Sequence, residues 1–241
     1  PLAVEQGKAR SVQLVGWNLP EELRRRDVPA ATGEATQIAD PRLAHPVNIK
    51  VLTNASYTRS EAQDESAKLS LPMSITGRFE EARSVHSYRI PAKKGEKLLA
   101  RVESASLGFN VDPVVRAVDP GGKVLAEVKA KKLHQDASLE FVPQTDGMHR
   151  LEISDLLGQA SIRHVYLLHV MKSAPDFSLS VASDTFTLSA GKPLEVPVST
   201  APVRGFKGAI EFLVEGLPDT VKATASAKGI RLVSEGGDFS G

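Results

Sequence analysis

The chain of 241 residues contains no cysteine, and aromatic residues make up only 5% of it. The absence of cysteine excludes disulfide bonds and zinc sites with thiolate ligands. With one tryptophan and three tyrosines, the chain has few rings for stacking on bases or sugars. Apolar faces of packed secondary structure must therefore supply the stability that neither cross-links nor large rings can provide.

Excess charge of one sign and long apolar runs are also missing. Lys and Arg number 30 against 29 Asp and Glu, a formal net charge of +1, which argues against a nucleic-acid or membrane-surface binder. No apolar run approaches the roughly 18 residues of a membrane-spanning helix, and Pro1–Glu5 does not open a secretory signal. Because the chain does not start with Met and ends in a turn-rich stretch, we expect it to be a segment of a longer protein.

Short runs of alternating apolar and polar residues dominate the chain and are typical of β-strands. The runs Val47–Leu52 and Leu98–Val102 predict half-buried strands, and the more continuously apolar run Val165–Met171 predicts a central strand. Helical periodicity is almost absent. The sequence therefore predicts an all-β fold.

Turn residues divide these strands. Asp119–Gly122 predicts a hairpin turn, because Pro presets one φ and Gly supplies a positive one. Asp146-Gly147 predicts a tight reversal between Leu139–Phe141 and Met148–Ile153. A proline before the charged segment 21–27 predicts one short helix there.

Catalytic signatures are absent from the sequence. The histidines are spread without metal-binding spacing, at positions 45, 86, 134, 149, 164 and 169. Ser189 and Lys192 match a Ser-x-x-Lys pattern but lie in a predicted turn rather than at the start of a helix. No nucleophile elbow, phosphate-binding loop or dinucleotide fingerprint occurs. We expect no enzyme here, although a Ser-His-Asp triad assembled from distant residues stays open.

Calcium and sugar are the remaining ligands to weigh. Asp112, Asp119 and Asp136 are candidate calcium ligands, but they are dispersed, and the basic run 129–132 lies beside Asp136. Calcium is a possible cofactor, although we expect no cofactor and no metal. Trp17 and the tyrosines could form a sugar-stacking platform, yet the alternating run before Trp17 favours a core position.

Six short motifs between residues 69 and 172 resemble, in their order, the bacterial pre-peptidase C-terminal domain. They are Ile75–Phe79, Ser87–Ile90, Lys94–Leu98, Val111–Pro113, Val118–Ala126 and Phe141–Leu151. That family is a jelly-roll-like β-sandwich appended to secreted proteases and to large surface proteins. Family members that bind calcium carry acidic residues where this chain has Glu127–Lys131, a basic stretch, so the resemblance implies that the metal site is lost.

The flanks resemble immunoglobulin-like modules of large planctomycete-type surface proteins. Val12–Pro20 is similar to the opening of one such module, and the chain from Pro175 onward is similar to another. We therefore expect an abbreviated immunoglobulin-like module over residues 1–58, a linker over 59–68, the central sandwich over 69–172 and a truncated immunoglobulin-like module over 175–241.

The resemblance implies export and a non-catalytic role. We expect an extracytoplasmic, secreted or cell-surface accessory, adhesion or spacer module that binds a polysaccharide or an extracellular protein. Its other partners would be further domains of the parent protein, without nucleic acid or membrane insertion. The alternative is a module that folds, secretes or targets a peptidase elsewhere in the parent chain.

Overall fold

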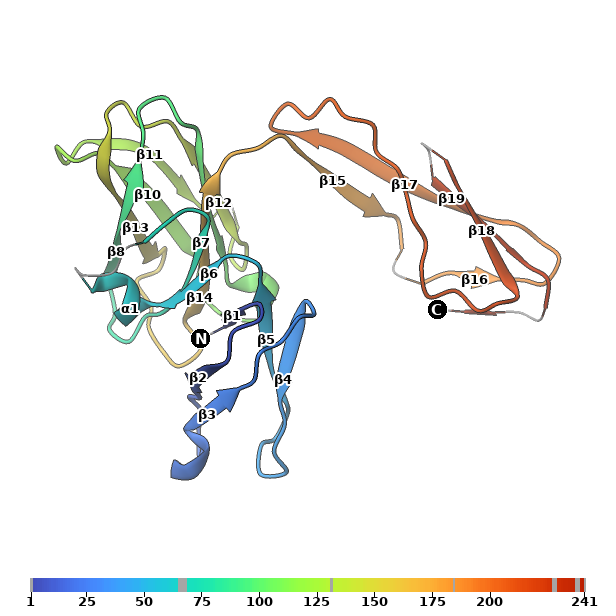
Figure 1. Ribbon diagram of the computed structural model, residues 1–241, viewed down its shortest axis with the longest axis horizontal. Coiled ribbons are helices and arrows are strands. Elements are labelled where there is room, and N and C mark those ends of the chain that lie inside the picture. The colour runs from blue at the N-terminus through green and yellow to red at the C-terminus, as the bar shows by residue number, and fades with distance from the viewer. Residues whose placement is uncertain are drawn as a thin grey trace. The chain divides into compact units, whose positions relative to one another are not determined.

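The structure is a computed structural model that describes residues 2–64, 69–130, 132–183, 185–226, 229–236 and 239–240. The fold is all-β, as the alternating pattern predicts, with one short α-helix and two 3-10 turns among the described residues. The chain divides into two compact units, Pro1–Ser173 and Ala174–Gly241. Figure 1 shows the strands of both units.

The centre of the first unit is a sandwich of two antiparallel-dominated sheets. The four-stranded sheet has the order β11-β10-β13-β8, and the five-stranded sheet has the order β12-β9-β14-β7-β6. The strands are β6 (Ala55–Thr58), β7 (Met73–Arg78), β8 (Val85–Ala92), β9 (Leu98–Glu103), β10 (Pro113–Val118), β11 (Val124–Lys129), β12 (Ala137–Phe141), β13 (Gly147–Asp155) and β14 (Val165–Lys172). A 3-10 turn, η2 (Ala105–Leu107), follows β9. As predicted, β14 is central, between β9 and β7.

The sandwich core consists of the inward positions of both sheets. In β8 the exposed and buried residues alternate, and in β13 each second residue from His149 onward is buried. Aliphatic residues dominate the core, and its buried rings are Phe79, Tyr88, Phe141 and Tyr166. Each buried methylene group stabilises the folded state by about 0.8 kcal/mol, so a core of this size can be stable without cross-links.

A chain of buried polar groups joins the two sheets inside this core. The Tyr166 hydroxyl lies 2.8 Å from His86 Nδ1 and 2.7 Å from the Tyr88 hydroxyl. All three residues are at most 1% exposed. Burial raises the pKa of Tyr88 to about 12 and keeps the Tyr166 hydroxyl protonated by raising its pKa well above the usual value. Each hydroxyl therefore has a partner, and the cost of burying it is offset.

Gly77 makes room for the Tyr166 ring. The two residues are opposite one another in the β7–β14 pair. A Cβ atom at position 77 would lie 2.3 Å from Tyr166 Cζ, which is far inside van der Waals contact. The motif around residue 77 thus contains glycine because a neighbouring strand places a ring where a side chain would be.

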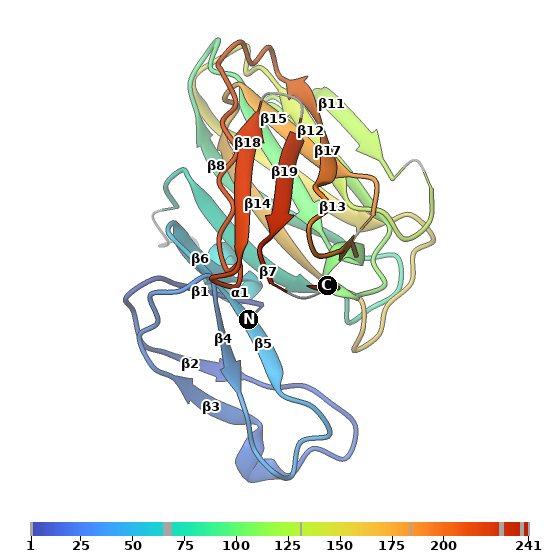
Figure 2. The ribbon, with the colours of Figure 1, turned by 90° about the vertical axis from the view of Figure 1, so that its right-hand side faces the viewer.

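Two small sheets precede the sandwich in the first unit (Figure 2). One contains β1 (Ala3–Glu5), β5 (Val47–Leu52) and β4 (Ala35–Ile38), with β1 parallel to β5. The other pairs β2 (Arg10–Gln13) with β3 (Arg25–Val28). Six aliphatic residues from these strands form a separate small core: Val4, Val12, Val28, Ile38, Ile49 and Val51.

The predicted linker differs from the structure. Residues 59–63 form the helix α1 (Arg59–Gln63), capped by Thr58, which makes a reciprocal capping box with Glu61. Residues 65–68 of the predicted linker lie outside the described residues. The preceding strand β6 pairs in parallel with β7, so residues 55–58 belong to the five-stranded sheet rather than to the N-terminal module. Polar composition was a poor guide here, because Ser, Thr and Glu are also the residues that begin helices.

The predicted helix near residue 21 is shorter than expected. It is a single 3-10 turn, η1 (Glu21–Leu23), and the chain then enters β3. The sequence favours Pro20 as the first helical residue, but Pro20 is the extended residue before the turn, which begins at Glu21. Pairing of β3 with β2 then ends the helical conformation early.

One predicted hairpin is correct and one reversal is wrong. β10 and β11 pair across Asp119–Gly122, where Asp119 Oδ1 accepts from the Lys123 amide at 2.8 Å and Gly122 has φ +90°. By contrast, β12 and β13 lie in different sheets, so the Asp146-Gly147 segment crosses the sandwich instead of closing a hairpin. Asp119 accepts within its own turn, whereas Asp146 accepts from the amide of Lys94, 52 positions away.

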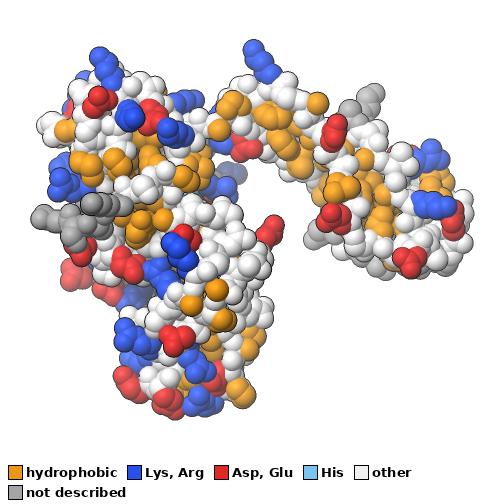
Figure 3. Space-filling view, viewed as in Figure 1, with side chains coloured by type: hydrophobic (Ala, Val, Ile, Leu, Met, Phe, Trp, Pro, Cys, Tyr) orange, Lys and Arg blue, Asp and Glu red, His pale blue; other side chains and the backbone are white. Residues whose placement is uncertain are grey.

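The second unit is built around one four-stranded sheet with the order β15-β17-β19-β18. Its strands are β15 (Asp176–Val181), β17 (Leu194–Val203), β19 (Gly229–Ser234) and β18 (Val221–Ser226), and β16 (Thr187–Leu188) pairs with β20 (Phe239–Ser240). The unit starts at Ala174, next to the Pro175 start that the sequence indicates. Leu179 and Val181 lie on β15 and are half exposed, and Figure 3 shows hydrophobic side chains on this unit.

Candidate functional site

The three aspartates predicted as calcium candidates use their carboxylates on the backbone. Asp112 accepts from the His134 amide, Asp119 from the Lys123 amide, and Asp136 from the amides of Ser104 and Ser106 at 2.8 and 3.3 Å. The structure does not bring the three together: in the described ranges, no three His, Cys, Asp or Glu side chains form a cluster that could hold a metal ion. Their observed role is to fix loops at the ends of strands.

We expect calcium to leave the melting temperature unchanged within about 1 °C. A cation that bound the native state alone would stabilise it in proportion to ln(1 + [Ca²⁺]/Kd), which shifts the melting curve. The measurement is thermal unfolding in millimolar calcium and in chelator, followed by circular dichroism. A rise of several degrees in calcium would show that the aspartates can leave their amide partners to bind the ion.

A serine, a histidine and a glutamate from distant parts of the chain do meet. Ser74 Oγ lies 2.8 Å from His169 Nδ1, and His169 Nε2 lies 3.5 Å from Glu103 Oε2. Ser74 and His169 are directly opposite on β7 and β14, with Glu103 on the neighbouring β9. The three residue types are those of a hydrolytic triad.

This Ser-His-Glu line is enclosed by the N-terminal part of the unit. Ser74 has no solvent exposure, and its hydroxyl accepts from the Asn54 side chain at 2.9 Å. Glu103 is bound by Lys50 at 2.7 Å and by Arg101 at 3.0 Å. The hydrogen bond with His169 and the contact with Lys50 lower the pKa of Glu103 to about 2. Ser74 is closed off from solvent, and the arrangement joins the small sheets to the sandwich.

Other contacts continue the same polar interface. The Ser56 hydroxyl donates to the Ala3 carbonyl at 3.0 Å, and the Leu2 amide donates to Thr76 Oγ1 at 2.9 Å. Ser56, Ser74, Thr76 and His169 lie on the face of the five-stranded sheet that points away from the sandwich core, and Leu2 and Ala3 pack against that face. Its polar residues are therefore satisfied within the first unit.

The aromatic residues behave differently from the sequence-based expectation. Trp17 is 84% exposed, not in the core, because β2 ends at Gln13 and the chain turns through Asn18 at φ +51°. Tyr88 and Tyr166 are fully buried, and Tyr57 packs against the sandwich core. The four rings form no common platform. The Ser189–Lys192 segment is a turn, as predicted, with the Lys192 amide donating to the Ser189 carbonyl.

The outward face of the four-stranded sheet carries most of its exposed charge. Arg116 lies between two carboxylates, Glu127 at 2.6 Å and Glu152 at 3.7 Å, and Lys129 lies 3.4 Å from Glu127. Arg150 lies 3.6 Å from Glu152. On the strand β8, the Arg89 side chain has no ion pair or hydrogen bond among the described residues. Four cationic side chains thus accompany two carboxylates on this face.

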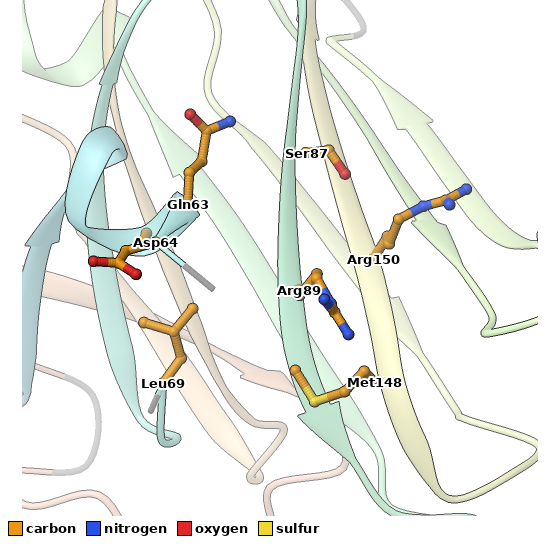
Figure 4. Close-up of a pocket in the computed structure, with 8 residues that line it drawn as sticks. Gln63, Asp64, Leu69, Ser87, Arg89, Met148 and Arg150 are labelled. Carbon is orange, nitrogen blue, oxygen red and sulfur yellow. The ribbon is translucent and has the colours of Figure 1, made fainter. Parts of the chain in front are cut away.

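A hollow of about 340 Å³ lies at one end of this face, between the end of α1 and the strands β8 and β13. Its lining includes Arg89 and Arg150, which are directly opposite in the β8–β13 pair, and in Figure 4 the Arg150 side chain leads away from α1. Figure 4 shows Arg89 and Met148 between the end of α1 and β13, with Leu69 on the helix side. The remaining lining residues are polar apart from one alanine: Ala62, Gln63, Asp64 and Ser87.

Sequence reasoning missed this hollow. Arg89 and Arg150 are 61 positions apart, and each occupies a polar position of an alternating strand, which is the ordinary place for a solvated arginine. Only the register of β8 against β13 makes them neighbours. The alternation could indicate that both face outward, but nothing in the sequence indicates that they face the same hollow.

Comparisons with known proteins identify no family for this chain. No family model and no curated protein matches the chain. One similar solved structure is the M60 catalytic domain with the CBM51-1 and CBM51-2 domains from Clostridium perfringens ZmpB. It has 7% sequence identity and a TM-score of 0.27, over 78% of this chain and 28% of that chain. The chain therefore spans less than a third of that neighbour, and the resemblance to the pre-peptidase C-terminal domain stays a prediction.

Proposed function

We propose that the first unit is a non-catalytic, extracytoplasmic module that binds a polysaccharide at the outward face of the four-stranded sheet. The observation that carries this is the hollow over β8 and β13, with charged, polar and apolar groups exposed side by side. Such a mixture suits a ligand that offers hydroxyls and ring C–H groups together. In the described part of the chain, no helix is long and apolar enough to span a membrane.

The burial of the Ser-His-Glu line supports the non-catalytic part of this proposal. Ser74 is unexposed, and its hydroxyl already has two partners, His169 and Asn54. A nucleophile must be able to reach the bond that it attacks. A role in folding or targeting a peptidase elsewhere in a parent chain rests on the sequence resemblance alone and stays the alternative.

We expect the protein to bind one or more immobilised polysaccharides saturably without cleaving them. The measurement is biolayer interferometry against a panel of neutral and acidic polysaccharides, followed by reducing-end and peptide-release assays on the bound material. Absence of binding across the panel would overturn the proposal. Turnover that disappears in Ser74→Ala, with the fold retained by circular dichroism, would show instead that the buried line is catalytic.

A further inference from the structure

We infer that the hollow recognises the carboxylate of an acidic saccharide, with Arg89 and Arg150 as the residues that select it. This inference rests on the proposed polysaccharide-binding function and names the class of sugar. It is carried by the position of the two arginines, which are directly opposite on neighbouring strands and line the same hollow.

Nearby carboxylates balance the arginine pair only in part: Asp64 lines the helix side of the same hollow, and Glu152 lies beside Arg150. Like charges directly opposite on neighbouring strands destabilise a sheet. Arg150 has one carboxylate, Glu152 at 3.6 Å, and Arg116 shares it at 3.7 Å. The Arg89 side chain makes no ion pair or hydrogen bond within the described ranges. A ligand carboxylate between the two guanidinium groups would supply the missing charge, and guanidinium groups hold carboxylates by paired hydrogen bonds.

The rest of the lining favours a sugar over an acidic peptide. Leu69 and Met148, the latter 42% exposed, offer an apolar surface for the C–H groups of one ring. Ser87 and Gln63 offer hydroxyl and amide groups that both donate and accept. Peptide recognition uses main-chain pairing or deep side-chain pockets. Within the hollow the main chains of β8 and β13 pair with each other, and the described lining contains no deep apolar pocket. The other side of β8 is the edge of the sheet, so an acidic peptide such as poly-glutamate is included in the test.

The test compares polymers that differ only in the carboxylate. Polygalacturonate and its methyl ester, and alginate as a second uronate, are immobilised and probed by biolayer interferometry at low and high salt. We expect the unmodified chain to bind a free uronate polymer at least about tenfold more tightly than the methyl ester, with salt weakening the binding. The affinity for the free uronate polymer should fall by about tenfold or more in Arg89→Gln, in Arg150→Gln and in the double variant.

Two variants serve as controls. Arg25→Gln removes the same charge from an exposed position of β3, away from the sandwich, and should keep its affinity within about twofold. Trp17→Ala removes the exposed indole and should also leave uronate binding unchanged. Circular dichroism melts of all variants check that each is folded.

The outcomes separate this inference from the proposed function. Equal binding of polygalacturonate and its methyl ester, or binding that survives the double arginine variant, overturns the carboxylate site while polysaccharide binding stands. Loss of binding in Trp17→Ala alone overturns it in favour of stacking on that ring. Arginine-dependent binding to poly-glutamate that matches or exceeds uronate binding overturns the saccharide assignment. Absence of binding to every polysaccharide overturns both proposals together.

Discussion

Replacing Gly77 with alanine should destabilise the first unit by roughly 3 kcal/mol or more, one of the largest effects of any single methyl group in this chain. The new Cβ would lie 2.3 Å from Tyr166 Cζ and 2.4 Å from the Tyr166 hydroxyl oxygen. The ring cannot swing aside cheaply, because its hydroxyl holds both His86 and Tyr88 and the residue is fully buried. Either the ring or the β7 backbone must shift. The melting temperature should fall by roughly 6–12 °C for a unit of this size.

The matched control is Gly33→Ala. A Cβ at Gly33 would lie 3.9 Å from the nearest backbone oxygen, and its φ is not positive, so the variant should melt within about 2 °C of the parent protein. A second control shortens the opposing side chain. The double variant Gly77→Ala/Tyr166→Leu should lose less free energy of unfolding than the two single variants lose together, because the clash is then removed. If Gly77→Ala melts like Gly33→Ala, the close approach of strand and ring is wrong.

Acid should destabilise the first unit between pH 6.5 and pH 4 through His86. Burial and the positive charge of Arg59 lower the pKa of His86 from 6.5 to about 4. The negative charge of Glu80 acts in the opposite direction but is a smaller effect. In this window the unfolded chain binds a proton that the folded chain does not, so the free energy of unfolding falls as pH falls. The expected loss from this group is about 2 kcal/mol between pH 7.5 and pH 5.

The pH dependence can be separated from the cost of changing the core. His86→Asn should be less stable than the parent at pH 7.5, yet its urea unfolding free energy should fall by about 2 kcal/mol less on going to pH 5. Glu103 has a folded-state pKa near 2 and a reference value of 4.5. It therefore lowers the free energy of unfolding mainly below pH 4.5, which is outside the range compared here. The exposed His45→Asn serves as control and should keep the parent's slope. An unchanged slope in His86→Asn would mean that other groups titrate in this window. Circular dichroism is the suitable probe, since the single tryptophan is already 84% exposed in the native state.

Local pattern was sufficient where the decisive interactions are local. The hairpin of β10 and β11 could be predicted, because Asp119 and Gly122 supply both the side-chain acceptor and the positive φ that the turn requires. The central position of β14 could be predicted from its run of apolar residues, since burial on both faces removes the alternation.

The sequence pattern did not predict features that depend on which distant strands pair with each other. The Asp146-Gly147 turn looks like a hairpin, yet β12 and β13 pair with β9 and β8, which the turn residues cannot specify. The position of Trp17 depends on where β2 stops, and the alternation alone does not mark that end. The arginine hollow is similar: each arginine is predictable as exposed, but only the β8–β13 register brings Arg89 and Arg150 to the same place.

The edge strand β6 of the sandwich comes from the segment that precedes residue 69, so the sandwich cannot be transferred intact to another protein as residues 69–172 alone. A gene fusion that begins at residue 69 would leave out β6 and open the unpaired edge of β7 to other chains. It would also bare Ser74, Thr76 and Glu103, whose partners Asn54, Leu2 and Lys50 would be missing. A fusion that is to keep the sandwich intact therefore has to include the strands β1 to β6 as well.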